Sequence, residues 1–317
     1  MNPFRHRAAC VALAAAALAA PPASAASLAL NASLAVPDTA PACRRDAFRL
    51  LIDVGHTSEA PGAVSARGVD EYDFNLTLAN ELVSALRAQG FAETTVMITR
   101  GPSRPALLAR VARINQIAPD LVLSIHHDSV PDRFLETFEY GDKPHRFSDR
   151  FSGHSIFVSA SNRRYAASVL FARLIGREMK ERGLRYTPHY TEKFMGERRR
   201  VLIDSENGVY RYDQLLVLKN THVPSVLLEA GSIINREEEW KLHLPKYRAP
   251  ILAAIAQALE SYCRLKPPEA SAVAAMPEHL IVDAPAKVAT VRKHRPTKAV
   301  AAAAKPAVTR LAHAGRK

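Results

Sequence analysis

The sequence has few cysteines and no long apolar run. Only three of its 317 residues are cysteine, which excludes a disulfide-dense scaffold and a zinc domain built from cysteines. The apolar stretch from Ala8 to Ala20 is too short to span a bilayer. Charged residues make up 23% of the chain and apolar residues 48%, so the chain can form the core of one enzyme-sized domain. This balance excludes a fibre and a wholly disordered protein.

The first 25 residues have the pattern of a secretory signal peptide. Arg5 and Arg7 provide a basic start, the apolar stretch follows, and the small residues at 23–25 form a cleavage site. We therefore expect an exported protein, periplasmic or secreted. Its mature chain would open with a lead-in segment over residues 26–47.

The formal charge of +12 is concentrated at the C-terminal end. Residues 266–317 contain ten Lys or Arg against three Asp or Glu, whereas residues 26–265 carry a net charge of only +3. The C-terminal segment is mostly Ala, Pro, Lys and Arg, so it cannot bury enough apolar surface to offset the entropy of ordering, and we expect a disordered basic tail. In an exported protein we expect no nucleic-acid partner, and we expect the tail to bind an anionic wall or membrane surface.

Between residues 48 and 265, short apolar runs alternate with helical patterns. The expected strands are 50–54, 95–99, 121–125, 155–159 and 225–228, and the expected helices are 74–86, 106–116, 165–182, 212–221 and 248–262. This alternation predicts a single three-layer α/β domain, with a mostly parallel, mixed central sheet covered by helices on both faces. Functional sites in such folds lie at the carboxyl ends of the strands.

Three of the expected strands lead into chemically active side chains. His56 follows the first strand, His126 the third, and Glu229 the last. Two imidazoles and one carboxylate are a typical ligand set for a catalytic zinc ion. Glu71, which precedes the first helix, is the best-placed carboxylate, although acidic residues there also cap helices. Glu229 is the candidate general base and acid. The alternative is that Glu229 is a strand-end acid paired with an arginine.

Four stretches of the chain, in this order, resemble the zinc-dependent N-acetylmuramoyl-L-alanine amidases called type 3 amidases. The first stretch is Ile52–His56 followed by Pro61-Gly62-Ala63, and the second is Glu71-Tyr72-Asp73. The third is Thr99-Arg100 with Leu107, Arg110 and Asn115, ahead of Ser124–His126. The fourth is Pro224–Glu229 followed by Asn235. The resemblance covers about Leu50 to Leu259. Each stretch alone is a weak indication, whereas the ordered set is specific.

The resemblance implies a role for each of the four site residues. His56, Glu71 and His126 would bind one zinc ion, and Glu229 would be the catalytic carboxylate. The family uses zinc-activated water to hydrolyse the amide between N-acetylmuramic acid and L-alanine in peptidoglycan, a substrate that agrees with export. Two other functions stay open: a peptidoglycan-binding protein on a degenerate amidase fold, and a zinc carboxypeptidase that acts on wall peptides.

Three features depart from the family's pattern. The residue after His126 is usually small, but here it is His127, which is an extra ligand, a substrate contact or a surface residue. Gly231–Asn235 lacks the family's phenylalanine, so we expect an aromatic wall of the site to be missing. Some relatives carry a long inserted helix that blocks the zinc. The sequence has no insert of that length between Ser159 and Tyr212, so we expect constitutive activity.

Several other polar residues are weaker candidates. Arg198–Arg200 would suit the carboxylates of the stem peptide, although a solvated loop is the alternative. His189 lies in a polar loop and is the one other histidine that invites a test. The segment from Asp128 to Gly153 is longer than a simple connection, and such loops often border a cleft.

The two cysteines of the expected mature chain flank the domain. Cys43 lies just before the first strand and Cys263 ends the last helix, whereas Cys10 belongs to the signal. Because the ends of a compact domain often lie close together and the compartment is oxidising, we expect an intramolecular Cys43–Cys263 disulfide. Two free thiols are the alternative.

Overall fold

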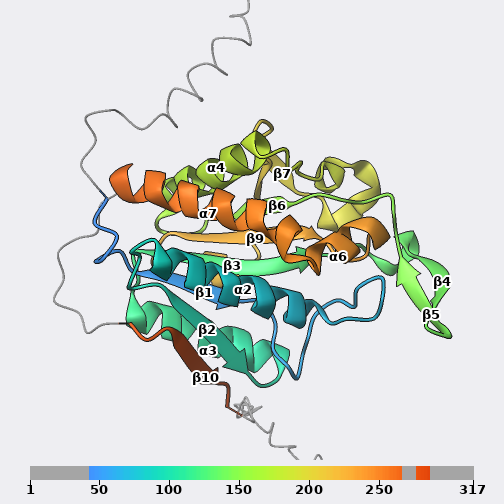
Figure 1. The fold of residues 1–317 in the computed structure, drawn as a ribbon, viewed down its shortest axis with the longest axis horizontal. Helices are drawn as coiled ribbons and strands as arrows, with labels where there is room; N and C mark the ends of the chain where they lie inside the picture. The colour runs from blue at the N-terminus through green and yellow to red at the C-terminus, as the bar shows by residue number, and fades with distance from the viewer. Residues whose placement is uncertain (1–42, 266–275, 286–317) are drawn as a thin grey trace, which may run out of the picture. The chain divides into compact units, whose positions relative to one another are not determined.

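The central sheet has eight strands. The computed structural model describes residues 43–265 and 276–285, and the strands follow the order β10-β2-β1-β3-β9-β6-β8-β7 (Figure 1). In chain order their bounds are β1 (Leu50–Val54), β2 (Thr95–Arg100), β3 (Leu121–Asp128), β6 (Ser155–Val158), β7 (Val201–Asp204), β8 (Val209–Arg211), β9 (Ser225–Ser232) and β10 (His279–Asp283). The five strands from β10 to β9 are parallel to one another, while β6 is antiparallel to β9, and β7 to β8. The sheet is therefore mixed and mostly parallel, as predicted.

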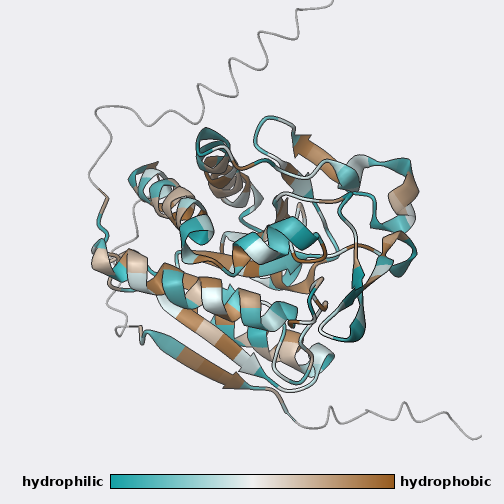
Figure 2. Cartoon of the chain, turned by 45° about the vertical axis from the view of Figure 1, so that its right-hand side comes forward, coloured by the Kyte–Doolittle hydropathy of each residue, from teal (hydrophilic) through white to brown (hydrophobic). Residues whose placement is uncertain are grey.

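Helices cover both faces of the sheet, which confirms the predicted three layers. One face carries α2 (Glu71–Ala88), α4 (Tyr165–Glu181) and α7 (Pro245–Leu265). The other carries α3 (Ser103–Ile117) and the short α5 (Leu216–Asn220). Figure 2 shows the apolar strands lying between helices whose residues alternate in hydropathy.

Side chains of each strand alternate between the two faces. In β1, Leu50 and Ile52 join the larger core under α2, α4 and α7, whereas Leu51 joins the smaller core under α3. All five residues of β1 are buried, which is why the strand is a continuous apolar run. The same alternation continues through β3, and it decides which face His126 and His127 occupy.

The first helix forms where its apolar residues predict it. Phe74, Leu78, Leu82 and Leu86 recur every four residues and are all buried in the larger core. The helix begins three residues earlier than predicted, at Glu71, so this carboxylate belongs to the first helical turn. The backbone of Glu71 is anchored to the preceding loop, because its N–H donates to the carbonyl oxygen of Ala63 at 2.8 Å.

The prediction that residues 266–317 form a disordered tail is wrong for the segment around β10. His279–Asp283 pairs in parallel with β2 and extends the sheet. Leu280 and Val282 face the core under α3, together with Met276, while the alternate residues of the strand are exposed. The sequence shows this alternation only as a short apolar patch over residues 279–282, too short to outweigh the composition of the whole segment. Residues 266–275 and 286–317 lie outside the described residues, as does the predicted signal peptide.

Several elements between the regular ones were not predicted. They are the hairpin of β4 (Glu136–Tyr140) and β5 (Lys143–Phe147), the 3₁₀ turns η1 (Asp132–Phe134), η2 (His189–Thr191) and η3 (Lys193–Arg198), strands β7 and β8, and helix α6 (Arg236–Leu242). Asn235 caps the start of α6, because its side chain accepts from the N–H groups of Glu237 and Glu238. The helix predicted over residues 212–221 is limited to α5.

A disulfide joins Cys43 to Cys263, as predicted, and it ties the start of the described domain to the end of α7. Within residues 43–265 and 276–285, no helix is both long and apolar enough to cross a membrane.

Candidate metal centre

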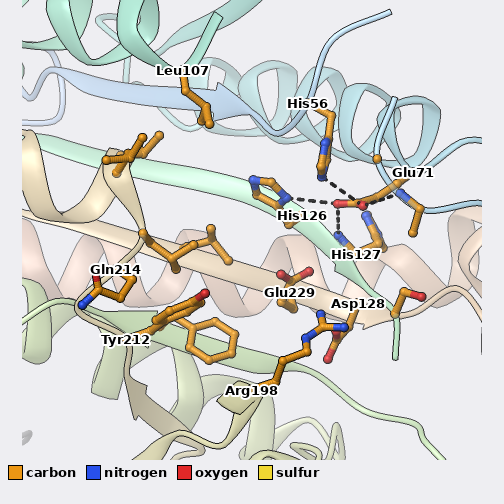
Figure 3. A pocket seen from close by; sticks show the side chains of 18 of the residues that line it. His56, Glu71, Leu107, His126, His127, Asp128, Arg198, Tyr212, Gln214 and Glu229 are labelled. Atoms are coloured by element: carbon orange, nitrogen blue, oxygen red, sulfur yellow. Dashed lines mark hydrogen bonds and ion pairs between the residues drawn. The ribbon is translucent and has the colours of Figure 1, made fainter. Parts of the chain in front are cut away.

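The structure brings His56, Glu71 and His126 together beyond β1 and beside β3 (Figure 3). Glu71 lies between the two histidines: its Oε2 is 3.0 Å from His56 Nε2, and its Oε1 is 3.0 Å from His126 Nδ1. One donor atom from each residue can be chosen so that all three lie within 4.8 Å of one another. His126 lies inside β3, which runs three residues further than predicted.

The backbone at His56 is held in a strained conformation. Its φ is +66°, in the left-handed region that residues other than glycine rarely adopt. The buried guanidinium of Arg110 fixes this turn, because its Nη2 donates to the carbonyl oxygen of His56 at 2.7 Å while its Nε lies 3.1 Å from Asp53 Oδ1. Such strain is retained where the surrounding structure imposes it, often at a functional site.

Two glycines leave room for the three side chains. A Cβ added to Gly55 would lie 2.5 Å from the ring of His126. At Gly62, whose φ is +88°, an added Cβ would lie 2.5 Å from Glu71 Oε2 and 2.7 Å from the ring of His56. The loop from β1 to α2 thus closes around the site at distances that no larger residue permits.

The electrostatics of the group suit a divalent cation. Burial raises the pKa of Glu71, but the hydrogen bonds with His126 and His56 outweigh burial and hold the pKa well below its usual range. Burial lowers the pKa of His126, so its ring is neutral at neutral pH. A carboxylate and neutral imidazoles are the forms that bind zinc, and the donor set therefore fits this ion.

Glu229 lies on β9 beside His126, with which it is in register across the parallel pair of strands. Its Oε2 is buried and has no hydrogen-bond partner among the described residues. Burial raises its pKa well above the usual value, and the nearby charges of Asp128 and Glu71 raise it further. The described structure contains no arginine paired with Glu229, contrary to the alternative considered from the sequence. A carboxyl oxygen without a partner is free to exchange a proton with a substrate.

His56, Glu71, His126 and Glu229 share a cavity of about 610 Å³. Its opposite side carries the aromatic side chains of Phe157, Tyr190 and Tyr212. The expectation that an aromatic wall is missing is therefore wrong: Ile233 and Ile234 are buried in the core, and aromatic side chains come from β6, η2 and the residue after β8 instead.

His127 is neither a surface residue nor part of the metal-binding group. The alternation of β3 turns it away from His126, and its side chain is buried against Phe74 of α2. Its Nδ1 lies 2.8 Å from Asn75 Oδ1, and burial lowers the pKa of its ring to about 3. This histidine fills the core beneath the site, although part of it reaches the cavity wall.

Asp128 and Tyr190 are site residues that the sequence analysis missed. Tyr190 donates a hydrogen bond to Asp128 Oδ1 at 2.7 Å, and both residues are buried in the cavity wall. The period of two along β3 was the available signal, because it puts Asp128 on the same face as His126. His189 lies behind them, with its Nδ1 2.6 Å from Thr187 Oγ1.

The long segment from Asp128 to Gly153 borders the cavity only at its start. Asp128 and Ser129 line the cavity, but the β4–β5 hairpin further along packs against the loop between β1 and α2. There a Cβ added to Gly68 would lie 2.7 Å from the ring of His145. The hairpin therefore supports the loop that leads to Glu71.

Comparison with known proteins identifies the family. The sequence pattern of N-acetylmuramoyl-L-alanine amidases matches residues 50–261. A putative N-acetylmuramoyl-L-alanine amidase of Buchnera aphidicola is 24% identical over 214 residues, which cover 67% of this chain and 95% of that protein. The amidase AmiA of Escherichia coli is 27% identical over 230 residues, which cover 67% of this chain and 75% of that protein.

Solved structures show the same fold. An N-acetylmuramyl-L-alanine amidase from Mycobacterium smegmatis superposes with a TM-score of 0.53 at 19% identity, over 69% of this chain and 98% of the other. An N-acetylmuramoyl-L-alanine amidase from Clostridium difficile gives a TM-score of 0.51 at 21% identity, over 70% and 99% of the two chains. Since the family pattern matches more than half of the sequence, the chain belongs to the N-acetylmuramoyl-L-alanine amidase family.

Proposed function

We propose that this amidase hydrolyses the bond between N-acetylmuramic acid and L-alanine of peptidoglycan with one zinc ion held by His56, Glu71 and His126. The observation that supports this most directly is the convergence of the three side chains beside Glu229, whose Oε2 has no hydrogen-bond partner among the described residues. When bound, zinc would polarise the amide carbonyl and lower the pKa of a water molecule. The strained turn at His56 and the space left by the two glycines hold the ligands ready for it.

Glu229 is assigned the proton transfers of the reaction. Its buried carboxylate accepts a proton from the attacking water, and the resulting carboxyl group donates that proton to the nitrogen of the leaving L-alanine. The elevated pKa of Glu229 brings the two protonation states closer in free energy at neutral pH, which both transfers need. Its position beside His126 puts it next to the group that would bind the metal.

The site is open to substrate. The side chain of His56 is 32% exposed. The segment between Ser159 and Tyr212 contains no inserted helix over this site, because its one long helix, α4, packs on the face of the sheet opposite to α3 and α5, which border the cavity. This supports the proposal that the amidase acts without an activator that displaces a blocking segment.

The three candidate functions predict different products from purified muropeptides. The amidase releases a peptide with a free L-alanine amino group, a carboxypeptidase releases one C-terminal amino acid, and a wall-binding protein releases nothing even with added zinc. Detection of the N-terminal L-alanine by mass spectrometry tests the proposal, and its absence with zinc present would overturn it. The presence of all four expected side chains in one cavity favours the amidase over a degenerate fold.

Export and wall attachment belong to the same proposal. Peptidoglycan is an extracytoplasmic substrate, which agrees with the predicted signal peptide and a periplasmic or secreted location. Residues 287–317 contain nine Lys or Arg and no Asp or Glu. Deleting them is expected to weaken binding to purified cell walls at low salt while leaving the turnover of soluble muropeptides unchanged. An equal loss of both would refute a role as a tether.

A further inference from the structure

The cavity has opposite charges on its two sides. The metal side is acidic, with Glu71, Asp128 and Glu229 in its wall, whereas Arg198 and Arg200 lie on the side formed by η3 and the start of β7. Figure 3 shows Arg198 and Tyr212 across Glu229 from the histidines. This separation of charge gives the cavity a direction along which a charged substrate can align.

Arg198 has a guanidinium available for a ligand. The side chain is exposed at the cavity, and its charge is close enough to Asp128 and Glu229 to oppose the rise that burial causes in the pKa of both, but it makes no hydrogen bond or ion pair with these or with another described residue. By contrast Arg110, which also reaches the cavity, is buried and engaged by Asp53 and the carbonyl oxygen of His56. A guanidinium presents paired N–H donors that match a carboxylate, so Arg198 suits an acidic group at this end.

Arg200 is held in place beside it. Its guanidinium lies over the ring of Tyr212 at 3.6 Å, and its Nη1 donates to the carbonyl oxygens of Glu197 and Arg199. Its Nε is buried without a hydrogen-bond partner among the described residues. Stacking on an aromatic ring reduces the conformational entropy that a long side chain loses when it binds a ligand.

We infer that Arg198 and Arg200 form a subsite that binds a carboxylate of the stem peptide and so selects acidic muropeptides. This inference rests on the proposed function, since it requires that the bond next to the metal joins the sugar to the peptide. With the scissile amide at the acidic side, the peptide extends toward η3 and β7. The second residue of a stem peptide is linked through its side chain, and its α-carboxyl group is therefore free unless the wall is amidated.

Two muramyl pentapeptides that differ only at this α-carboxyl group, free acid or carboxamide, test the subsite. Arg198→Ala is expected to raise KM for the acid about tenfold, the effect of losing one charge-assisted hydrogen bond, while kcat and the kinetics on the carboxamide stay nearly unchanged. Arg200→Ala is expected to change KM in the same direction. Arg198→Lys keeps the charge but loses the paired donors, so it should retain part of the preference.

Arg199 supplies the matched control. It is exposed in the same segment but does not line the cavity, and its Nε donates to the carbonyl oxygen of Thr191. Arg199→Ala removes the same charge and is expected to leave both substrates unaffected. An equal KM change in Arg198→Ala and Arg199→Ala would show a general effect of loop charge and overturn the inference.

The remaining outcomes are also decisive. A fall in kcat on both substrates in Arg198→Ala would assign Arg198 to the electrostatics of Glu229 instead of to substrate binding. Unchanged kinetics on both substrates would exclude the subsite. If wild-type protein with zinc released no peptide from either muropeptide or from cell walls, the proposed function itself would fail, so the two failures are distinguishable.

Discussion

The parallel and mixed halves of the sheet supply different parts of the site. The half from β10 to β9, with the loop after β1 and the start of α2, supplies the proposed metal ligands, and Glu229 lies on β9 at its border. The half formed by β6, β8 and β7, together with η2 and η3, carries the aromatic wall and the two arginines. In the proposed function, chemistry and substrate recognition thus come from parts of the chain with different architectures.

The difference between the halves is one of constraint. Around the metal centre, each side chain is fixed by strand pairing, by the buried Arg110 or by the close approach of Gly55 and Gly62. Across the cavity, Arg198 ends a short 3₁₀ segment and is exposed. Precise geometry favours rigid elements, whereas specificity can vary in irregular segments without disturbing the catalytic groups.

Glu229→Gln, at the border of the halves, has the largest expected effect. The amide keeps the shape of the side chain but cannot accept the proton of the attacking water, so kcat should fall about 1,000-fold. The zinc content, measured by atomic absorption, should stay at one ion per chain because the three ligands are untouched. Activity close to that of the wild type would refute the assigned role, and loss of zinc would show that Glu229 belongs to the ligand set.

Removing the disulfide tests the stability of both halves together. Because the bond joins residues 220 positions apart, the double variant Cys43→Ser, Cys263→Ser is expected to lose about 3 kcal/mol of unfolding free energy in urea titrations. Zinc affinity and muropeptide turnover at 25 °C should stay the same, since neither cysteine reaches the cavity. A loss of zinc affinity without unfolding would show that the bond positions the ligands.

Gly62→Ala perturbs only the metal half. The added Cβ would meet Glu71 Oε2 and the ring of His56, so zinc affinity in chelator competition should fall between roughly 10- and 100-fold. Gly183→Ala is the matched control in the mixed half, because Gly183 also has a positive φ, +77°, but its Cβ would enter open space. Equal zinc affinities in the two variants would argue against His56 and Glu71 as ligands.

His154 is expected to make the mixed half sensitive to acid. Burial lowers the pKa of this histidine to about 4, and neither ring nitrogen has a hydrogen-bond partner among the described residues. Below the usual histidine pKa of about 6.5, His154 binds a proton in the unfolded chain but not in the folded protein. The free energy of unfolding therefore falls as the pH drops from about 6.5 toward 4. The expected loss between pH 7 and pH 5 is on the order of 1–2 kcal/mol.

Urea titrations at both pH values check this contribution. His154→Leu removes the titrating group and should flatten the pH dependence by that amount, whereas His222→Leu, at an exposed position, should not. An unchanged slope in His154→Leu would mean that this ring is protonated in the folded protein.

The sequence predicted the parallel half far better than the mixed half. Strands β1 and β3 are continuous apolar runs, and α2 has a clear period, so local patterns agree with the tertiary structure. The convergence of His56, Glu71 and His126 followed from their places after strands and before a helix. The residue types and their placement indicated their roles as ligands, the family resemblance strengthened the assignment of Glu71, and these roles stay a prediction.

The remaining features depend on contacts between distant residues. Strands β7 and β8 have four and three residues, too few to show a period. Tyr190 reaches the cavity because η2 packs beneath β6, which no local pattern reveals. His127 was considered with its neighbour His126, yet the pleat of β3 buries it on the other face. Tertiary packing, not propensity, decides such positions.

Strand β10 has a practical consequence for making the catalytic domain. The family match ends at residue 261, and a fragment cut there would lack β10 and expose the backbone N–H and C=O groups along the edge of β2. It would also expose the residues of the core under α3 that pack against Leu280 and Val282. A bare parallel edge of this kind templates pairing between molecules, so a fragment ending at the homology boundary should aggregate, while one that continues past Asp283 keeps its edge covered.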